Sequence, residues 1–151
     1  MDELPEAVIA DMDGTIVDVR GIRHLINGPG SFHAFHMASV NCPVNQWVVD
    51  ELRAHAALGR AILITTAREA RYRHVSAWSL ALNTVPSDAM YMRPNSDFRP
   101  DEVIKAEILA KIRLRYRPVH AYDDRPEPCA LWMRERIPLT VVPGWDPALA
   151  R

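Results

Sequence analysis

The sequence predicts an α/β fold with a five-stranded parallel sheet, because short apolar runs alternate with longer segments of helical pattern. Runs that are apolar throughout suit strands buried on both faces, as in a parallel sheet with helices on both sides. At 151 residues, with 48% hydrophobic and 25% charged content, the chain suits one globular domain spanning residues 1–151. The predicted strands cover residues 7–10, 61–66, 89–92, 119–122 and 139–142.

Four helices are expected in the segments between and after these strands. Pro43 opens the first, which stops near Gly59, and the second follows Glu69. The third begins at Pro100 and Asp101 and has the clearest apolar stripe. That stripe consists of Val103, Ile104, Ile108, Leu109 and Ile112, and the fourth helix runs from about Pro126 to Arg136.

Large apolar side chains on these helices are expected to face the core. Trp47 lies on the apolar side of the first helix, and Val75, Trp78 and Leu82 mark that side of the second. Leu131 and Trp132 do so on the fourth.

Residues 19–42 are the exception to the alternating pattern. They show no sustained period and contain the turn signal "NGPG". A segment this long between a strand and a helix is more often functional than a plain connector, and it is too short for a separate domain. We therefore expect a small flap over the sheet, and no large cap.

The composition of the chain indicates where the protein works but not what it binds. The net charge is −1, which argues neither for nor against a nucleic-acid partner. Cys42 and Cys129 stand far apart with no CxxC pairing, so neither a disulfide framework nor a zinc site is expected. The first apolar run is too short for a signal peptide or a membrane span. These features favour a cytoplasmic protein without a membrane partner.

Polar residues collect where the predicted strands end, which is where open parallel sheets bind ligands. Asp11 and Asp13 have alternate positions on one strand, so their carboxylates share a face and repel one another unless a cation lies nearby. Mg²⁺ prefers carboxylate oxygens, and cations suit the oxygens of a phosphoryl group. The collected residues are Asp11, Asp13, Gly14, Thr15, Thr65, Thr66, Arg68, Lys105, Asp123, Asp124 and Arg125.

The segments "DMDGTIVD", "TTAR", Lys105 and "YDDR" resemble, in order and spacing, the four motifs of the haloacid dehalogenase (HAD) superfamily. Across nearly the whole chain, the sequence is most similar to the phosphatase half of bacteriophage polynucleotide kinase 3′-phosphatases. The resemblance implies a Rossmann-like HAD fold. It also implies an Mg²⁺-dependent phosphomonoesterase that forms an aspartyl-phosphate and removes 3′-phosphates from polynucleotide ends.

The resemblance also implies a role for each motif residue. Asp11 would be the nucleophile, Asp13 the general acid and base, and Thr66 a ligand of a phosphate oxygen. Lys105 would neutralise the phosphoryl charge. Asp11, Asp123, Asp124 and the backbone carbonyl of Asp13 would hold Mg²⁺. The substrate-binding residues expected beside them are Gly14, Thr15, Arg20, Arg23, Arg68 and Arg125.

This sequence departs from the family pattern at three points. It has Thr66-Ala67-Arg68 where relatives have Ser-Gly-Arg, which keeps the hydroxyl and the guanidinium. It contains no G-x-x-x-x-G-K-[ST], so no kinase activity is expected. Relatives carry an arginine in the loop after the nucleophile, where this chain has Ile22 between Arg20 and Arg23. Which of the two substitutes is left open.

Less specific interpretations accompany these assignments. Alone, Asp123 and Asp124 would suit a helix N-cap, and Lys105 an exposed helix position. Arg71 and Arg73 are expected on a solvated face. His33 and His36 have the spacing of a metal pair only if a helix forms there, and Trp145 could stack on a base.

Other functions compatible with the motifs are a nucleotide or small-metabolite phosphatase and a catalytically idle phosphate-binding domain. A separate kinase or ligase partner is left open.

Overall fold

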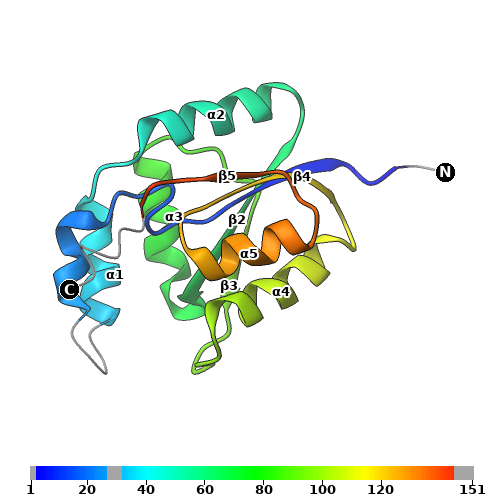
Figure 1. Ribbon diagram of the computed structural model, residues 1–151. Helices are drawn as coiled ribbons and strands as arrows, with labels where there is room; N and C mark the ends of the chain where they lie inside the picture. The colour runs from blue at the N-terminus through cyan, green and yellow to red at the C-terminus, as the bar shows by residue number, and fades with distance from the viewer. Residues whose placement is uncertain (1–2, 27–31, 145–151) are drawn as a thin grey trace.

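A computed structural model of the chain describes residues 3–26 and 32–144 (Figure 1). Its centre is a five-stranded sheet in the order β3-β2-β1-β4-β5, and every neighbouring pair is parallel. The predicted α/β fold is confirmed, including the placement of the first strand beside the fourth. The strands are β1 (Glu6–Ala10), β2 (Ala61–Glu69), β3 (Ala89–Arg93), β4 (Arg117–Asp123) and β5 (Leu139–Val141).

Helices cover both faces of the sheet. In Figure 1, α2 lies above the sheet and α4 and α5 lie below it. The core residues of α2 and α3 belong to one apolar cluster, and those of α4 and α5 belong to the other. The helices are α1 (Phe32–Ala38), α2 (Gln46–Ala57), α3 (Arg73–Leu82), α4 (Asp101–Ile112) and α5 (Pro126–Arg134), with the 3-10 helices η1 (Arg20–Leu25), η2 (Ser39–Asn41) and η3 (Ala70–Tyr72).

The central strand β1 is buried on both of its faces. Val8 and Ala10 pack into the cluster with α2 and α3, whereas Ala7 and Ile9 pack into the cluster with α4 and α5. All four are fully buried, which explains why this strand reads as a continuous apolar run. Trp132 on α5 is fully buried as predicted.

Two of the tryptophans expected in the core are at the surface, which corrects the sequence prediction. Trp47 is 43% exposed and Trp78 is 62% exposed. On α3, Ser76 and Ser79 face inward, because the Ser76 hydroxyl accepts a hydrogen bond from the buried Arg68 guanidinium. That rotation of the helix turns Trp78 outward. Leu82, at the end of α3, and Val103, in the stripe of α4, are also exposed.

The flap at residues 19–42 contains more regular structure than its sequence indicates. It forms η1, α1 and η2, and α1 has only seven residues, of which Phe35 and His36 are buried. So short a helix leaves no repeating apolar period to detect. The part of the chain that the structure describes includes no large cap, as expected. The "NGPG" turn lies outside the described residues.

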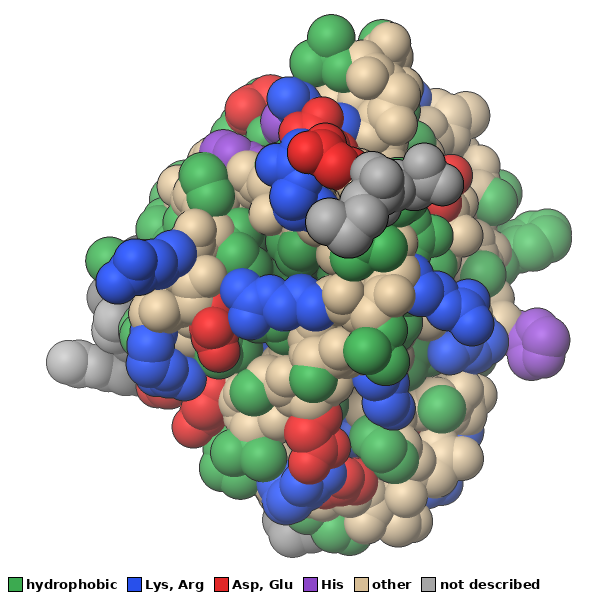
Figure 2. Space-filling model, turned by 90° about the vertical axis from the view of Figure 1, so that its right-hand side faces the viewer, with side chains coloured by type: hydrophobic (Ala, Val, Ile, Leu, Met, Phe, Trp, Pro, Cys, Tyr) green, Lys and Arg blue, Asp and Glu red, His purple; other side chains and the backbone are tan. Residues whose placement is uncertain are grey.

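Figure 2 shows the end of the molecule where the strands begin, away from the flap. Lys and Arg side chains are spread across this face, with acidic and apolar side chains between them. The last turns of α4 and α5 contribute Lys111 and Arg134, which suits the negative end of the helix dipole. Among the described helices, none has the length and apolar character needed to span a membrane.

Candidate active site

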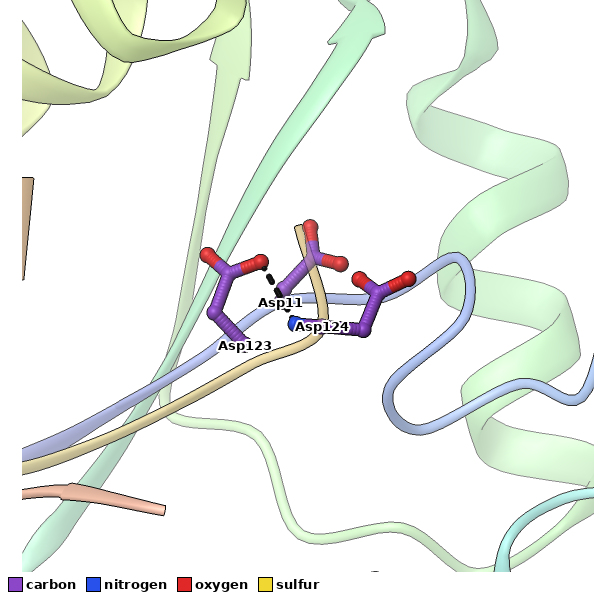
Figure 3. Close-up of side chains that lie close together, drawn as sticks. All are labelled: Asp11, Asp123 and Asp124. Atoms are coloured by element: carbon purple, nitrogen blue, oxygen red, sulfur yellow. Dashed lines mark hydrogen bonds between the residues drawn. The ribbon is translucent and has the colours of Figure 1, made fainter. Parts of the chain in front are cut away.

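Three carboxylates meet at the edge of the sheet where β1 and β4 end (Figure 3). Asp11 follows β1, Asp123 ends β4 and Asp124 comes next in the chain. One oxygen from each carboxylate lies within 4.8 Å of the other two, and all three residues are buried. The sequence prediction that these acids share one site is therefore supported by their positions.

Local hydrogen bonds fix this arrangement. The backbone N–H of Asp11 donates to the carbonyl of Tyr122 at 3.0 Å, which joins the ends of the two strands. Asp123 Oδ1 accepts the backbone N–H of Asp124 at 2.9 Å, the bond drawn in Figure 3. Its other oxygen accepts the indole N–H of Trp132 at 3.0 Å. The core tryptophan of α5 thus orients an acid of the site.

Lys105 reaches the site from the second turn of α4. Its Nζ donates to Asp11 Oδ1 at 2.9 Å and to Asp123 Oδ2 at 2.7 Å. Burial would lower the pKa of Lys105, but the two carboxylates outweigh it and raise that pKa, so the ammonium stays charged. Lys105 is 2% exposed, which excludes the alternative of a solvated helix lysine.

The electrostatics of the acids favour a divalent cation among them. Burial raises the pKa of Asp11 and of Asp124. The charges of Asp123 and Asp124 raise the pKa of Asp11 further, and the charge of Asp123 does the same to Asp124. Lys105 balances only part of this negative charge. Mg²⁺ takes oxygen ligands and would relieve the repulsion, so the donor set fits the predicted metal. Asp13 is not in this carboxylate group; its expected metal contact is through its backbone carbonyl.

Asp13 instead forms a two-pronged ion pair with Arg68. Arg68 Nε donates to Asp13 Oδ2 at 2.8 Å, and Nη2 donates to Oδ1. Burial would raise the pKa of Asp13, but the guanidinium outweighs it and holds that pKa below its usual range. The Arg68 guanidinium also donates to the hydroxyls of Ser39 and Ser76, at 2.7 and 3.0 Å.

Arg68 lines the pocket that opens onto this site, but its guanidinium is paired with Asp13, so the substrate-binding role expected for it stays a prediction. Strand β2 runs to Glu69, so Arg68 lies on the strand rather than after it, and it is 2% exposed. Its planar fork is directed at Asp13. The contacts of Arg68 could not be predicted from the sequence, because Asp13, Ser39 and Ser76 lie far from it along the chain.

The turn after β1 fits closely around the acids. Gly14 has φ +84°, and a Cβ there would overlap the Asp124 carboxylate. Thr15 is fully buried, and its hydroxyl lies 3.2 Å from both Asp11 Oδ2 and Asp124 Oδ1. Both residues therefore shape the carboxylate group itself.

A pocket of about 410 Å³ opens onto this site, in the size range of ligand sites. The residues that line it include Asp11, Asp13, Thr66 and Lys105. Thr66 Oγ1 accepts the backbone N–H of Arg68 at 3.1 Å.

The three other arginines of the predicted site differ in position. Arg23, from the flap, lines the pocket and lies 3.9 Å from Asp124 Oδ2. Arg125 also lines it and donates to Asp101 Oδ2 at 2.7 Å. Arg20 does not: it is largely exposed and forms a bidentate pair with Asp18. Of the two flap arginines, Arg23 is the one the structure brings to the site.

Of the less specific interpretations, the helix cap is wrong and the surface arginines are confirmed. Asp123 and Asp124 do not cap α5, whose N-cap is Arg125. Arg71 and Arg73 are exposed, as expected.

His36 is buried beside the pocket, and burial lowers its pKa to about 4. Among the described residues, neither His33 nor His36 belongs to a metal-binding group. Trp145 lies outside the described residues.

Sequence reasoning missed the loop between β3 and α4. Arg93 at its start is buried, and its Nη2 donates to Asp101 Oδ1 at 2.6 Å. Phe98 and Arg99 from this loop line the pocket. This loop could have been predicted to lie beside the site, because β3 ends at the same edge of the sheet as β1, β2 and β4.

Comparison with known proteins agrees with this geometry. The family model of the polynucleotide kinase PNKP phosphatase domain matches residues 5–143. The chain belongs to this family. Membership confirms the expected HAD phosphatase relationship and the enzyme class, phosphoric monoester hydrolase.

Solved structures support the same relationship. A chain from the structure of the Pnkp1/Rnl/Hen1 RNA repair complex is 29% identical, with a TM-score of 0.80 over 92% of this chain and 42% of that one. A second structure of the Pnkp1/Rnl/Hen1 complex is 30% identical, with a TM-score of 0.77, and is matched over 92% and 46%. This chain thus spans less than half the length of either.

Solved structures of lower sequence identity share the same fold. The class C acid phosphatase from Bacillus anthracis with tungstate bound is 10% identical, with a TM-score of 0.68 over 95% of this chain and 69% of that one. At that identity the likeness shows the fold alone.

Proposed function

We propose that this protein is an Mg²⁺-dependent phosphomonoesterase that removes 3′-phosphates from polynucleotide ends through an aspartyl-phosphate on Asp11. The observation that carries the proposal is the pairing of two differently held acids at the end of β1. Asp11 lies among carboxylates and Lys105, whereas Asp13 is held by Arg68. Environments that separate two carboxylates in this way assign them different chemical roles.

In the first step, a carboxylate oxygen of Asp11 attacks the phosphorus atom. The ester P–O bond breaks, its electron pair goes to the leaving oxygen, and Asp13 in its protonated form supplies the proton. The products of this step are an aspartyl-phosphate and a free 3′-hydroxyl.

In the second step, Asp13 as a carboxylate takes a proton from water. The water oxygen attacks the same phosphorus atom, and the bond between phosphorus and the Asp11 oxygen breaks. Inorganic phosphate leaves and Asp11 returns as a carboxylate. Arg68 favours the ionised form of Asp13, which this step requires; the first step requires the protonated form and works against this preference.

The other site residues bind and orient the phosphoryl group. Lys105 neutralises its charge and holds Asp11, and Thr66 donates its hydroxyl to a phosphate oxygen. Asp11, Asp123, Asp124 and the backbone carbonyl of Asp13 would hold Mg²⁺, which when bound supplies charge stabilisation at the phosphoryl oxygens. The retention of every one of these groups argues against a catalytically idle domain.

The proposed substrate follows from the family and from the open site. Two of the similar structures are of the Pnkp1/Rnl/Hen1 complex, which is an RNA repair complex, and this supports a nucleic-acid substrate. The absence of a large cap from the described residues suits the end of a macromolecule better than an enclosed small metabolite. By the same likeness, we propose that the protein works beside separate repair partners. The two unpaired cysteines favour the cytoplasm as the place where it does so.

The test is phosphate release from four substrates: a 3′-phosphorylated oligonucleotide, its 5′-phosphorylated counterpart, a 3′-mononucleotide and a sugar phosphate. We expect the 3′-phosphorylated oligonucleotide to have the highest kcat/KM. EDTA should stop the reaction, and added Mg²⁺ should restore it. Activity that persists after tightly bound metal is removed would refute the metal dependence. A preference for the sugar phosphate would favour a metabolite phosphatase.

A further inference from the structure

Phe98 is an aromatic side chain displayed at the rim of the catalytic pocket. It is 85% exposed, the highest value among the large hydrophobic residues that the structure describes. It lines the same pocket as Asp11 and Asp13. A phenylalanine left in water gains nothing from burial, so folding alone gives no reason for its position.

The loop that carries Phe98 is anchored on both sides. Arg93 Nη1 donates to the carbonyls of Asp97 and Arg99, the two neighbours of Phe98, at 2.8 and 2.5 Å. Arg93 Nε donates to the carbonyl of Ala67 on β2 at 2.8 Å. The backbone on either side of the ring is therefore tied to the strand that carries Thr66.

Two further contacts hold the first half of this loop. The backbone N–H of Ser96 donates to Glu69 Oε2 at 2.9 Å, and that of Arg71 donates to Asn95 Oδ1 at 2.8 Å. A loop fixed in this way can present a ring with little loss of entropy when a ligand binds.

The other exposed phenylalanine of the pocket has a partner within the protein. Phe32 is 53% exposed, and its ring stacks on that of His36 with the centroids 6.0 Å apart. Phe98 has no ring contact among the described residues. The two rings are thus not equivalent, and Phe98 is the one with a free face.

We infer that Phe98 is a stacking platform for the base of the nucleotide whose 3′-phosphate is removed. The inference rests on the proposed function and adds to it the recognition of the terminal base. One pocket contains both the phosphoryl-binding groups and this ring, so a ligand with a phosphate and a planar base can use both. Every base has a π-face, so stacking tolerates any terminal base.

The test compares Phe98→Ala with Phe98→Trp on two 3′-phosphorylated oligonucleotides that differ only in the last nucleotide. One has its base, and the other is abasic. Wild type should show a lower KM for the end with a base, by about five- to hundredfold, the range of aromatic stacking. In Phe98→Ala, the ratio of KM for the abasic end to KM for the end with a base should fall toward one. In Phe98→Trp, this KM ratio should be kept.

Trp78→Ala is the matched control, because Trp78 is an exposed aromatic on α3 that does not line the pocket. The KM ratio between the abasic end and the end with a base should be the same in Trp78→Ala as in wild type. The melting temperature of each variant checks folding, and little change is expected at these exposed positions.

Two results would overturn the inference in distinguishable ways. If wild type releases phosphate from 3′ ends but Phe98→Ala keeps the full ratio, stacking on Phe98 is wrong and the proposed function stands. If wild type prefers a sugar phosphate to both oligonucleotides, the proposed function fails and the inference fails with it.

Discussion

Asp13 and Asp11 lie two residues apart at the end of β1, but their side chains have different partners. Two residues earlier, Asp11 is held by Lys105 and lies beside two more carboxylates. Asp13 instead accepts both prongs of the Arg68 guanidinium, which lowers its pKa against the effect of burial. The sequence predicted both acids from their spacing, but it could not predict this division, which depends on where a side chain from β2 points.

The first prediction at this scale concerns proton transfer by Asp13. Asp11→Asn should abolish turnover of every phosphate monoester, because no aspartyl-phosphate can form. Asp13→Asn should reduce turnover of an alkyl phosphate by about 10²–10⁴-fold, the usual contribution of general acid catalysis. The reduction should be smaller with p-nitrophenyl phosphate, whose leaving group hardly needs a proton. Steady-state rates on both substrates check this, and equal losses would contradict the role of Asp13.

The second prediction concerns Arg68 as a positioning residue for Asp13. Arg68→Lys keeps the charge but loses the two-pronged geometry, so kcat should fall on the order of 10²-fold. The melting temperature should also fall, because the buried hydrogen bonds to Ser39 and Ser76 are lost. In an Asp13→Asn background, the same substitution should cause no comparable loss, because the group it positions is gone. A full additional loss in the double variant would show that Arg68 acts independently of Asp13.

The turn between β1 and η1 shows how an element serves the site. Its one glycine at positive φ allows the backbone to pass against the Asp124 carboxylate, which no other residue could do at Gly14. This turn was predictable, because Gly14 follows two acids at a strand end.

The orientation of α3 was not predictable. Trp78 and Leu82 look like core residues by their spacing, but the helix turns Ser76 inward to bind Arg68. A polar contact at a site thus overrode the apolar pattern.

The third prediction tests the turn with two other glycines as controls. Gly59 has φ +83° and Gly21 does not have a positive φ, and a Cβ at either would meet nothing within 4 Å. Gly59→Ala should therefore cost about 1 kcal/mol of unfolding free energy through backbone strain alone. Gly21→Ala should be close to neutral.

Gly14→Ala should cost more than Gly59→Ala and should also reduce activity by at least about tenfold, because it displaces an acid of the site. Denaturant unfolding and phosphate release check the set. Full activity in Gly14→Ala would show that the close approach to Asp124 is not needed.

At the scale of the whole molecule, the site is the product of the sheet topology. Five parallel strands end at one edge, and the order β2-β1-β4 puts the motif residues of three strands side by side. That convergence could be predicted from the sequence, because parallel strands share their carboxyl end. The surface around the site could not, since the positions of arginines in the flap follow no periodic pattern. Arg20 and Arg23 differ by three positions, and only Arg23 lines the pocket.

The last prediction concerns how strongly this surface binds the rest of a nucleic acid. Arg99 lines the pocket but is already paired with Asp97 and Glu107, so a substrate phosphate has to compete with carboxylates. We therefore expect only one or two backbone phosphates to be contacted. For a single strand, the logarithm of affinity falls with the logarithm of salt by about 0.7 per phosphate. Between 50 and 200 mM salt, KM for a 3′-phosphorylated oligonucleotide should rise by about three- to sevenfold.

Two comparisons make this measurement decisive. A 3′-mononucleotide has no neighbouring phosphate, so its KM should respond less to salt. Arg99→Gln should reduce the response of the oligonucleotide, whereas Arg113→Gln should not. Arg113 is similarly exposed and also paired with an acid, Glu135, but it follows α4 at the far end from the site. If the mononucleotide is hydrolysed as efficiently as the oligonucleotide and with the same salt response, end processing is wrong and a nucleotide phosphatase takes its place.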